Sequence, residues 1–256
     1  MRLVNKVAIV TGAAGGIGQA IIEKLTSEGA KVVAVDISSE ALKVFESYGS
    51  EKVKSLAVDV TDFQQVEGMV KQAAEQFGQL DIMVNNAGIG APKPLLQHDP
   101  RADFDPITQV NQYGVYYGIL AAARQFQAQS TQGVIINTSS VYGQMAAELT
   151  FTYNVSKAAV DMMTKCAALE LAPLGIRVCA VAPGRVDTPM LRQYEAIGLW
   201  EHIRKEQMRD TMTQPQEIAN VVAFLASDEA NCINGTTVSA SDGFENFKYP
   251  LLDKIQ

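Results

Sequence analysis

The chain has 256 residues, of which 47% are hydrophobic and 19% are charged. A chain of this length can form one α/β domain with a large core, and its composition excludes a disordered, collagen-like or coiled-coil protein. The 21 basic and 28 acidic residues give a net charge of −7, and no apolar run approaches the ~20 residues of a membrane span, so we expect neither nucleic acid nor a membrane as a partner.

Short β-branched segments alternate with longer segments of helical periodicity along the chain. The expected strands are 6–10, 31–35, 53–58, 81–84, 134–138, 177–181 and 236–239. The expected helices are 18–28, 63–76, 115–127, 153–171 and 215–226. Strands separated by helices indicate βαβ units, and continuous apolar strands indicate a sheet covered on both faces. We therefore predict an α/β fold, a single Rossmann-like domain over residues 1–256 with a doubly wound parallel sheet of about seven strands and helices on both faces.

The longest interruption of this rhythm runs from residue 183 to residue 214. A connection of that length in a compact domain usually carries a function. Residues 190–212 have helical periodicity and are rich in methionine, with the chain's single tryptophan. We predict that about residues 187–213 form a lid over the substrate. The alternative is an amphipathic helix whose apolar side faces the core or another subunit.

A glycine-rich loop, TGAAGGIG from Thr11 to Gly18, follows the first expected strand and opens the first helix. Glycine permits a tight turn and a close approach of the backbone to a pyrophosphate, and the helix N-terminus offers free N–H groups to that anion. Because the strand and the helix flank the loop in this order, the sequence predicts a dinucleotide site.

Asp36 stands at the end of the second expected strand. A carboxylate at this place can bond both ribose hydroxyls of an adenosine, and it would repel a 2′-phosphate. No lysine or arginine occurs at 13–15 or 37–42 to bind that phosphate. We therefore expect NAD rather than NADP, the alternative being a merely solvated aspartate.

Tyr153 and Lys157 are one turn apart in an expected helix and so lie on one face. A phenol has a pKa of about 10, and a neighbouring ammonium favours its ionised form. Such a phenol can exchange a proton with an alcohol. A second pair with the same spacing, Tyr48 and Lys52, has no serine at the corresponding upstream position, whereas Tyr153 has Ser140.

Ser140 follows the strand expected over 134–138, at the edge where open α/β sheets bind ligands. Its hydroxyl can bond a substrate oxygen and stabilise charge that develops there. Ser139 is the competing candidate, and the spacing to Tyr153 favours Ser140.

Two histidines and three scattered cysteines offer little for other chemistry. They predict neither a zinc site nor a Ser-His-Asp triad, so no metal is expected. An odd, sparse set of cysteines fits a reducing cytoplasmic compartment.

These motifs together resemble those of the short-chain dehydrogenase/reductase family, from Lys6 to about Gly243. The glycine-rich loop is similar to the family's TGxxxGxG, NNAG at 85–88 matches its motif after the fourth strand, and Ser140, Tyr153 and Lys157 match its catalytic set. The resemblance implies as cofactor-binding residues Gly12, Gly15, Gly16, Ile17, Gly18, Asp36, Asp59, Val60, Asn86, Ala87, Gly88, Tyr153, Lys157, Pro183, Gly184, Val186 and Thr188.

The resemblance also implies roles for single residues. Asn111 would stand in a distorted helix turn that holds a water beside the lysine, which completes the catalytic set of Asn111, Ser140, Tyr153 and Lys157. Asp59 would lie near the adenine amino group. The similarity weakens at the C-terminus, where Phe244 replaces a usual glycine and opens an unusual tail over 244–256, so the family's C-terminal packing and subunit contact stay open.

The resemblance implies NAD-dependent hydride transfer between a small secondary alcohol (a diol, polyol, sugar or steroid-like molecule) and its ketone, by a homo-oligomer, commonly a tetramer. The expected substrate residues are Ser140, Val141, Met145, Tyr153, Met190 and Trp200, with Gly90, Ala91, Leu149 and Leu191 as further candidates. The alternatives are an NADPH-linked 3-oxoacyl-acyl-carrier-protein reductase and a non-catalytic dinucleotide sensor. Asp36 and the acidic net charge argue against the first, and the intact Ser-Tyr-Lys set argues against the second. The substrate, its stereochemistry, the physiological direction and the pathway stay open.

Overall fold

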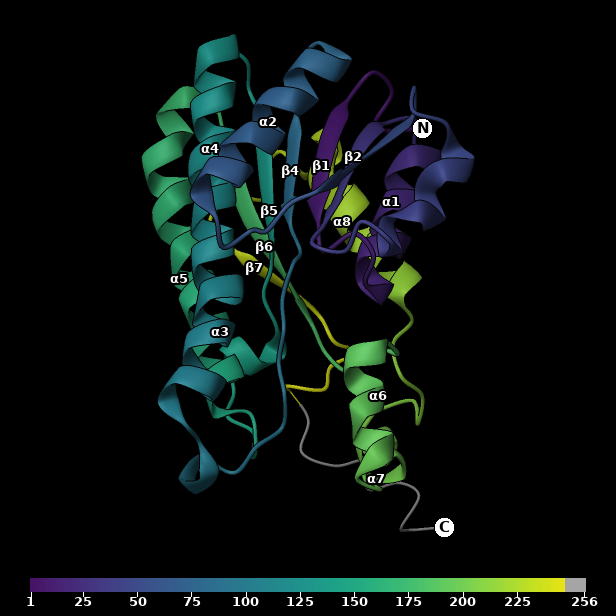
Figure 1. The fold of residues 1–256 in the computed structure, drawn as a ribbon, viewed down its shortest axis with the longest axis vertical. Coiled ribbons are helices and arrows are strands. Elements are labelled where there is room, and N and C mark those ends of the chain that lie inside the picture. The colour runs from purple at the N-terminus through teal and green to yellow at the C-terminus, as the bar shows by residue number, and fades with distance from the viewer. Residues whose placement is uncertain (247–256) are drawn as a thin grey trace.

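The computed structural model describes residues 1–246, and its centre is one seven-stranded sheet (Figure 1). The strands are β1 (Val7–Thr11), β2 (Lys31–Asp36), β3 (Val53–Ala57), β4 (Ile82–Asn85), β5 (Val134–Thr138), β6 (Arg177–Pro183) and β7 (Thr237–Ala240). Their order is β3-β2-β1-β4-β5-β6-β7, and every neighbouring pair is parallel. The predicted α/β fold, with a Rossmann-like doubly wound sheet, is confirmed.

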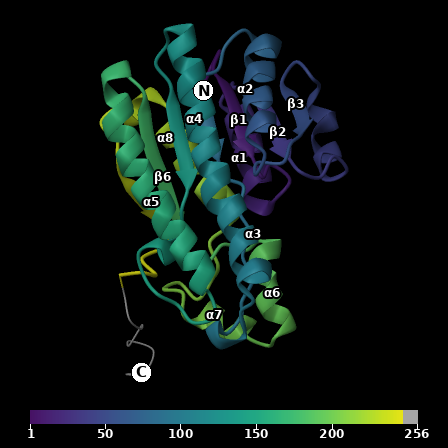
Figure 2. The same ribbon diagram turned by 60° about the vertical axis from the view of Figure 1, so that its left-hand side comes forward.

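Helices cover both faces of the sheet, as expected (Figures 1 and 2). They are α1 (Gly16–Ser27), α2 (Phe63–Phe77), α3 (Asp105–Thr108), α4 (Gly114–Gln129), α5 (Phe151–Leu171), α6 (Pro189–Ala196), α7 (Trp200–Lys205) and α8 (Pro215–Ala226). The apolar residues of α1 and α8 pack on one face, and those of α2, α4 and α5 pack on the other.

Buried strand residues alternate between the two cores, because successive side chains of a strand point to opposite faces. In β1, Ala8 and Val10 belong to the core under α1 and α8, whereas Ile9 belongs to the core on the other face. Since both faces are covered, the strands have continuous apolar sequences rather than alternating ones.

The direction of winding reverses at β1, which lies between β2 and β4. At such a point the connecting loops diverge and leave a crevice at the carboxyl ends of the strands, where open α/β sheets bind ligands. The glycine-rich loop between β1 and α1 lies at this crevice.

The connection between β6 and α8 contains two short helices, α6 and α7, which lie beyond the carboxyl ends of the strands (Figure 1). The helical periodicity over 190–212 thus corresponds to two helices separated by a turn at 197–199. A parallel bridge between Val186 and Thr213 joins the two ends of the connection.

No helix within residues 1–246 is both long enough and apolar enough to cross a membrane. The expectation about the unusual C-terminal tail concerns mainly residues 247–256, which lie outside the described residues. Within the described part, the ring of Phe244 meets the ring of Tyr142 edge-on, with 6.3 Å between their centres.

Candidate active site

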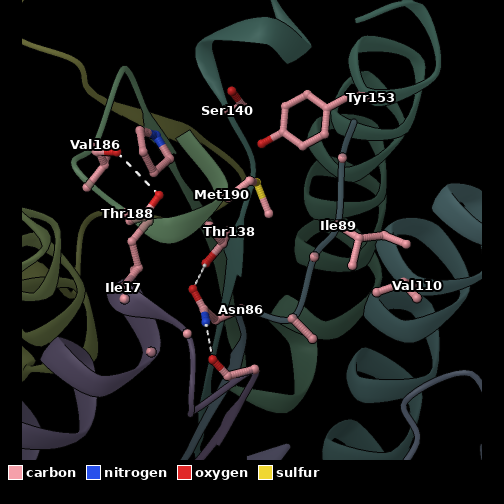
Figure 3. Close-up of a pocket in the computed structure, with 18 of the residues that line it drawn as sticks. Ile17, Asn86, Ile89, Val110, Thr138, Ser140, Tyr153, Val186, Thr188 and Met190 are labelled. Atoms are coloured by element: carbon pink, nitrogen blue, oxygen red, sulfur yellow. Dashed lines mark hydrogen bonds between the residues drawn. The ribbon is translucent and has the colours of Figure 1, made fainter. Parts of the chain in front are cut away.

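A cavity of about 520 Å³ opens at the carboxyl ends of the strands (Figure 3). It extends from the end of β2 and the glycine-rich loop, past the ends of β4 and β5, to α5 and α6. Every residue that the sequence predicts for cofactor binding lines it. One continuous space thus runs from the predicted adenosine end to the predicted catalytic residues.

The glycine-rich loop forms a cradle that a larger residue would fill. A Cβ atom on Gly18 would lie 2.1 Å from the carbonyl oxygen of Gly12 and 2.8 Å from the Cα of Ala13. The loop can therefore fold back on the first turn of α1 only because residue 18 has no side chain. At the N-cap of α1, Gly15 offers no side chain to the free N–H groups of that turn. These groups fit a pyrophosphate.

Asp36 joins the end of β2 to this cradle. Its Oδ2 accepts a hydrogen bond from the backbone N–H of Ala14 at 3.1 Å, and its Oδ1 accepts one from Ser38 at 3.2 Å. The carboxylate is half-buried and lines the cavity. Within the described lining, the cationic residues are Lys157 and Arg185. They lie on the catalytic side of the cavity, so the charged side chains that line the predicted adenosine side, Asp36 and Asp59, are both acidic.

The Asn86 side chain connects three strand ends that border the cavity. Its Nδ2 donates to the carbonyl oxygens of Thr11 at 3.0 Å and Gly12 at 3.2 Å, and its Oδ1 accepts a hydrogen bond from Thr138 at 3.3 Å (Figure 3). One side chain therefore fixes the ends of β1, β4 and β5 relative to one another.

Tyr153 lies in the first turn of α5, and its hydroxyl group points toward Ser140 (Figure 3). Burial raises the pKa of Tyr153, and Ser140 offsets part of this rise. The Ser140 oxygen accepts the N–H of Tyr142 at 3.2 Å. Its hydroxyl hydrogen therefore stays free to donate toward Tyr153 or a substrate oxygen.

Lys157 is buried beside the Tyr153 ring, yet the pKa of Tyr153 is raised and not lowered. Its Nζ donates to the carbonyl of Thr138 at 2.7 Å and lies 5.6 Å from the centre of the Tyr153 ring. Burial lowers the pKa of Lys157 to about 8, partly offset by Asp161. The net lowering of the Tyr153 pKa that the spacing predicts is therefore wrong for the protein alone, because desolvation of the phenol outweighs the effect of any nearby positive charge.

Asn111 lies outside the cavity lining and acts on the loop that borders it. It is buried in a π-helical turn, Gln109–Tyr113, which is the helix distortion that the resemblance implied. Its side chain bonds both the N–H of Ile89, at 2.8 Å, and the carbonyl of Ile89, at 2.9 Å. The next residue, Gly90, packs so closely on Tyr153 that a Cβ there would lie 2.9 Å from the ring. Asn111 is therefore a positioning residue for the loop that supports Tyr153.

Ser139 lines the cavity as well, but its hydroxyl donates to the backbone carbonyl of Lys157 at 3.3 Å. Ser140, in contrast, faces the Tyr153 hydroxyl. The structure therefore favours Ser140 over Ser139 for contact with a substrate.

The predicted substrate residues divide into two groups. Ser140, Tyr153 and Met190 line the cavity, together with Gly90, Ala91 and Leu191. Val141, Met145 and Trp200 are absent from this lining, and Leu149 lines a smaller cavity of about 170 Å³.

Val141, Met145 and Trp200 each have other surroundings. Val141 is buried in the core, because the chain turns into a 3₁₀ helix, Val141–Gly143, directly after Ser140. The backbone of Met145 is held by Asn154, which donates to its carbonyl at 2.8 Å. Trp200 begins α7, and the guanidinium of Arg192 lies 5.4 Å from its ring centre.

The residues that sequence reasoning missed at the substrate end include Tyr142, Arg185 and Tyr194. The available signal was Arg185, a charge directly after Pro183-Gly184. Tyr142 and Tyr194 gave none, because nothing local in the sequence shows that both rings lie beside the Arg185 guanidinium. Within residues 1–246, no group of three or more His, Cys, Asp or Glu side chains could hold a metal ion.

Comparison with known proteins places this geometry among oxidoreductases. A family model described as enoyl-(acyl carrier protein) reductase matches residues 12–245. The (S)-acetoin-forming diacetyl reductase of Staphylococcus epidermidis is 35% identical over 254 residues, which cover 93% of this chain and 98% of that protein.

Solved structures agree closely with the fold. Levodione reductase has a TM-score of 0.90 at 33% identity, over 96% of this chain and 100% of that chain. The 3-ketoacyl-(acyl-carrier-protein) reductase of Brucella melitensis, solved in complex with NADH, has a TM-score of 0.87 at 32% identity, over 95% and 99% of the two chains.

Proposed function

The chain belongs to the short-chain dehydrogenase/reductase family, and on that premise we propose that it is an NAD-dependent oxidoreductase acting on a secondary alcohol and its ketone. The observation that carries the proposal is the shared cavity. The glycine-rich loop and Asp36 line one side of it, and the Tyr153 hydroxyl faces Ser140 on the other. Relatives named diacetyl reductase and levodione reductase act on small ketones, which supports this substrate class.

NAD is supported by the charge of the adenosine side. Asp36 is held at the edge of the glycine-rich loop by two backbone N–H groups. Its carboxylate can accept hydrogen bonds from ribose hydroxyls and would repel a 2′-phosphate. The chemistry that such a cofactor supplies when bound is hydride transfer at the alcohol carbon.

Tyr153 is proposed as the acid and base. In reduction, its hydroxyl gives a proton to the ketone oxygen, and in oxidation, its phenolate takes the proton of the alcohol. Because burial raises its pKa, the phenol holds its proton at neutral pH, and oxidation should become faster as the pH rises.

Two further side chains support this proton transfer. Ser140 donates a hydrogen bond to the substrate oxygen. Lys157, buried next to the Tyr153 ring, provides a positive charge that stabilises the phenolate once it forms.

A 3-oxoacyl-acyl-carrier-protein reductase is the second candidate, favoured by the name of the Brucella melitensis neighbour. That neighbour was solved with NADH, so Asp36 does not by itself separate the two candidates. Acyl thioester substrates in the assay below distinguish them.

We also propose a substrate lid, a homo-oligomeric assembly and a cytoplasmic location. Met190, Leu191 and Tyr194 line the cavity from α6, which supports a lid over about residues 187–213. Tyr116, Val155, Met162 and Leu169 are exposed apolar side chains of α4 and α5, which supports a homo-oligomer such as a tetramer. All three cysteines are free, which suits a cytoplasmic location.

The test is a cofactor-absorbance assay with secondary alcohols, polyols, hydroxysteroids and 3-oxoacyl thioesters, each with NAD(H) and NADP(H). We expect turnover with NAD(H), reduced about 10²- to 10⁴-fold in Tyr153→Phe. Tyr48→Phe is the matched control, since Tyr48 has the same spacing to a lysine but lies outside the cavity lining. Unchanged turnover in Tyr153→Phe would refute the proposed acid and base.

A further inference from the structure

Arg185 stands at the substrate end of the cavity, two residues after β6, and the proposed chemistry does not use it. Its guanidinium carbon lies 5.3 Å from the ring centre of Phe244, 5.7 Å from that of Tyr142 and 6.0 Å from that of Tyr194. Three aromatic rings therefore surround one cation. Aromatic faces attract a guanidinium and hold its plane, but they leave the donors on its edge unpaired.

Within the described part of the chain, most of the hydrogen-bonding capacity of this guanidinium is unused. Within residues 1–246, its Nη2 donates to Glu206 Oε2 at 2.8 Å, whereas its Nε is buried without any partner. A guanidinium has five N–H donors in a fixed plane and stays charged at every relevant pH. A buried donor without a partner is unfavourable, so the guanidinium, as residues 1–246 surround it, can take a further acceptor.

Glu206 does not take up the remaining donors of the Arg185 guanidinium. The Glu206 side chain is 32% exposed against 11% for Arg185, and its Oε1 lies 3.4 Å from His202 Nε2. The contact with Arg185 is thus a single hydrogen bond from the solvent side, not the paired contact that a carboxylate and a guanidinium can form. Arg185 lines the cavity and Glu206 does not, so the cavity side of the guanidinium is open to a ligand.

Two of the rings around Arg185, those of Tyr142 and Tyr194, lie near the proposed catalytic residues. Tyr142 donates its backbone N–H to the Ser140 oxygen at 3.2 Å, and its side chain lines the same cavity. Tyr194 also lines the cavity and lies near enough to Tyr153 to affect its pKa. A molecule whose oxygen meets Tyr153 and Ser140 would therefore extend along these rings toward Arg185.

We propose that Arg185 binds a carboxylate group of the substrate, so that the preferred substrate is a hydroxy acid or its oxo acid rather than a neutral alcohol or ketone. The proposal rests on the function proposed above, because the hydroxyl of the same molecule is the one that meets Tyr153. A planar carboxylate can take paired hydrogen bonds from the guanidinium edge. The Arg185 side chain is only 11% exposed, and a charge pair is stronger in such surroundings than in water.

The competing role for Arg185 is a latch that holds the lid through Glu206. The two roles predict opposite effects of Glu206→Gln. If Arg185 binds the substrate, this change removes a competing and repelling carboxylate, and the KM for an acid falls. If Arg185 is a latch, the change weakens lid closure, and kcat/KM falls for acids and neutral substrates alike.

The experiment compares linear 2-, 3- and 4-hydroxy acids with their methyl esters, assayed with NAD and wild-type, Arg185→Met and Glu206→Gln enzymes. Arg124→Met is the matched control. Arg124 also bonds one carboxylate at 2.8 Å, from Glu67, and also lies 5.7 Å from an aromatic ring, that of Phe63, but it lies outside the cavity lining.

We expect the wild-type enzyme to prefer at least one acid to its ester. Arg185→Met should lower kcat/KM for that acid about 10- to 100-fold, which is the effect expected from the loss of a hydrogen bond between charged groups. It should change kcat/KM for the ester less than about threefold. Glu206→Gln should lower the KM for the acid, and Arg124→Met should change neither substrate. A wild-type preference for esters, or an equal loss for acid and ester in Arg185→Met, would overturn the proposal.

A binding measurement separates this proposal from the proposed function. Calorimetry with the matching oxo acids in the presence of NAD reports binding without turnover. Binding that disappears in Arg185→Met supports the carboxylate site even if no alcohol is oxidised, a result that would refute the proposed reaction alone. Turnover of neutral alcohols without measurable binding of any acid would refute the carboxylate site alone.

Discussion

Replacing Asp36 by asparagine tests the cofactor assignment with almost no change in shape. The carboxylate accepts the N–H of Ala14 at 3.1 Å on one oxygen and the N–H of Ser38 at 3.2 Å on the other. An asparagine side chain has one acceptor oxygen, so it can keep only one of these contacts, and it carries no charge.

The size of the effect follows from two contributions. A hydrogen bond to a charged group contributes ~1.5–3 kcal/mol, so loss of the charge should weaken NADH binding about 10- to 100-fold. Two unit charges 4 Å apart repel by ~4 kcal/mol at an effective dielectric constant of 20. Because Asp36 is only half-buried, we discount this to ~1–2 kcal/mol, a gain in NADPH binding of about tenfold. The preference for NADH should thus fall by about 10²- to 10³-fold.

The assay is a fluorescence titration of NADH and NADPH against wild-type protein, Asp36→Asn and a control, Asp62→Asn. Asp62 also accepts two backbone N–H groups, those of Gln64 at 2.9 Å and Gln65 at 3.3 Å, but it caps α2 outside the cavity lining. The control should leave both affinities unchanged. Wild-type protein that binds NADPH as tightly as NADH, or an unchanged preference in Asp36→Asn, would refute the reasoning.

Three further changes test the cradle, the loop and the buried lysine. Gly18→Ala forces a Cβ to 2.1 Å from a carbonyl oxygen, so the melting temperature and the NADH affinity should both fall. In the control, Gly68→Ala, the new Cβ has no atom within 4 Å and should stabilise α2 by up to ~1 kcal/mol. Asn111→Leu removes both hydrogen bonds to Ile89, so kcat should fall more than ten-fold, which corresponds to ~1.4 kcal/mol, while the NADH affinity stays unchanged. Equal losses of kcat and of NADH affinity would contradict the positioning role of Asn111. The pKa of Lys157 is lowered from 10.5 to about 8 in the folded protein. The unfolded chain therefore binds more protons between these values, and folding stability should rise with pH over this window, a rise that Lys157→Met should remove in denaturant titrations.

The fold and the cofactor side of the cavity could be predicted because their signals are local. A strand, a glycine-rich loop and a helix follow one another in the sequence, and parallel strands bring all their carboxyl ends to one edge. Asp36 and Asn86 each stand at a strand end. Once the strand order is known, their place in the cavity follows.

The substrate side could not be predicted in the same way, because it depends on how α6 and α7 fold over the sheet. Periodicity over 190–212 indicated one helix, and Trp200 was the largest apolar side chain within it. The turn at 197–199 instead directs Trp200 toward Arg192 and leaves Met190 and Tyr194 at the cavity. The one local signal for that turn is Gly198, whose φ is +73°, but a glycine shows only that a helix ends and not where the next one is directed.

The direction of the pKa shift of Tyr153 could not be predicted from the sequence either. Helical spacing correctly placed Lys157 one turn away, but it could not show that the ammonium donates to Thr138 or that the phenol is buried. Burial comes from tertiary packing, and here it raises the pKa of Tyr153, although the spacing to Lys157 alone predicts a lowered pKa.

The most direct measurement is a crystal structure of the protein with NADH and a bound substrate analogue that carries a ketone or hydroxyl group. We expect the analogue's oxygen to lie within hydrogen-bond distance, ~2.5–3.0 Å, of both Tyr153 Oη and Ser140 Oγ, with its reacting carbon facing the nicotinamide. A nicotinamide bound elsewhere, or a Tyr153 hydroxyl turned away with no space for a carbonyl beside it, would contradict the account.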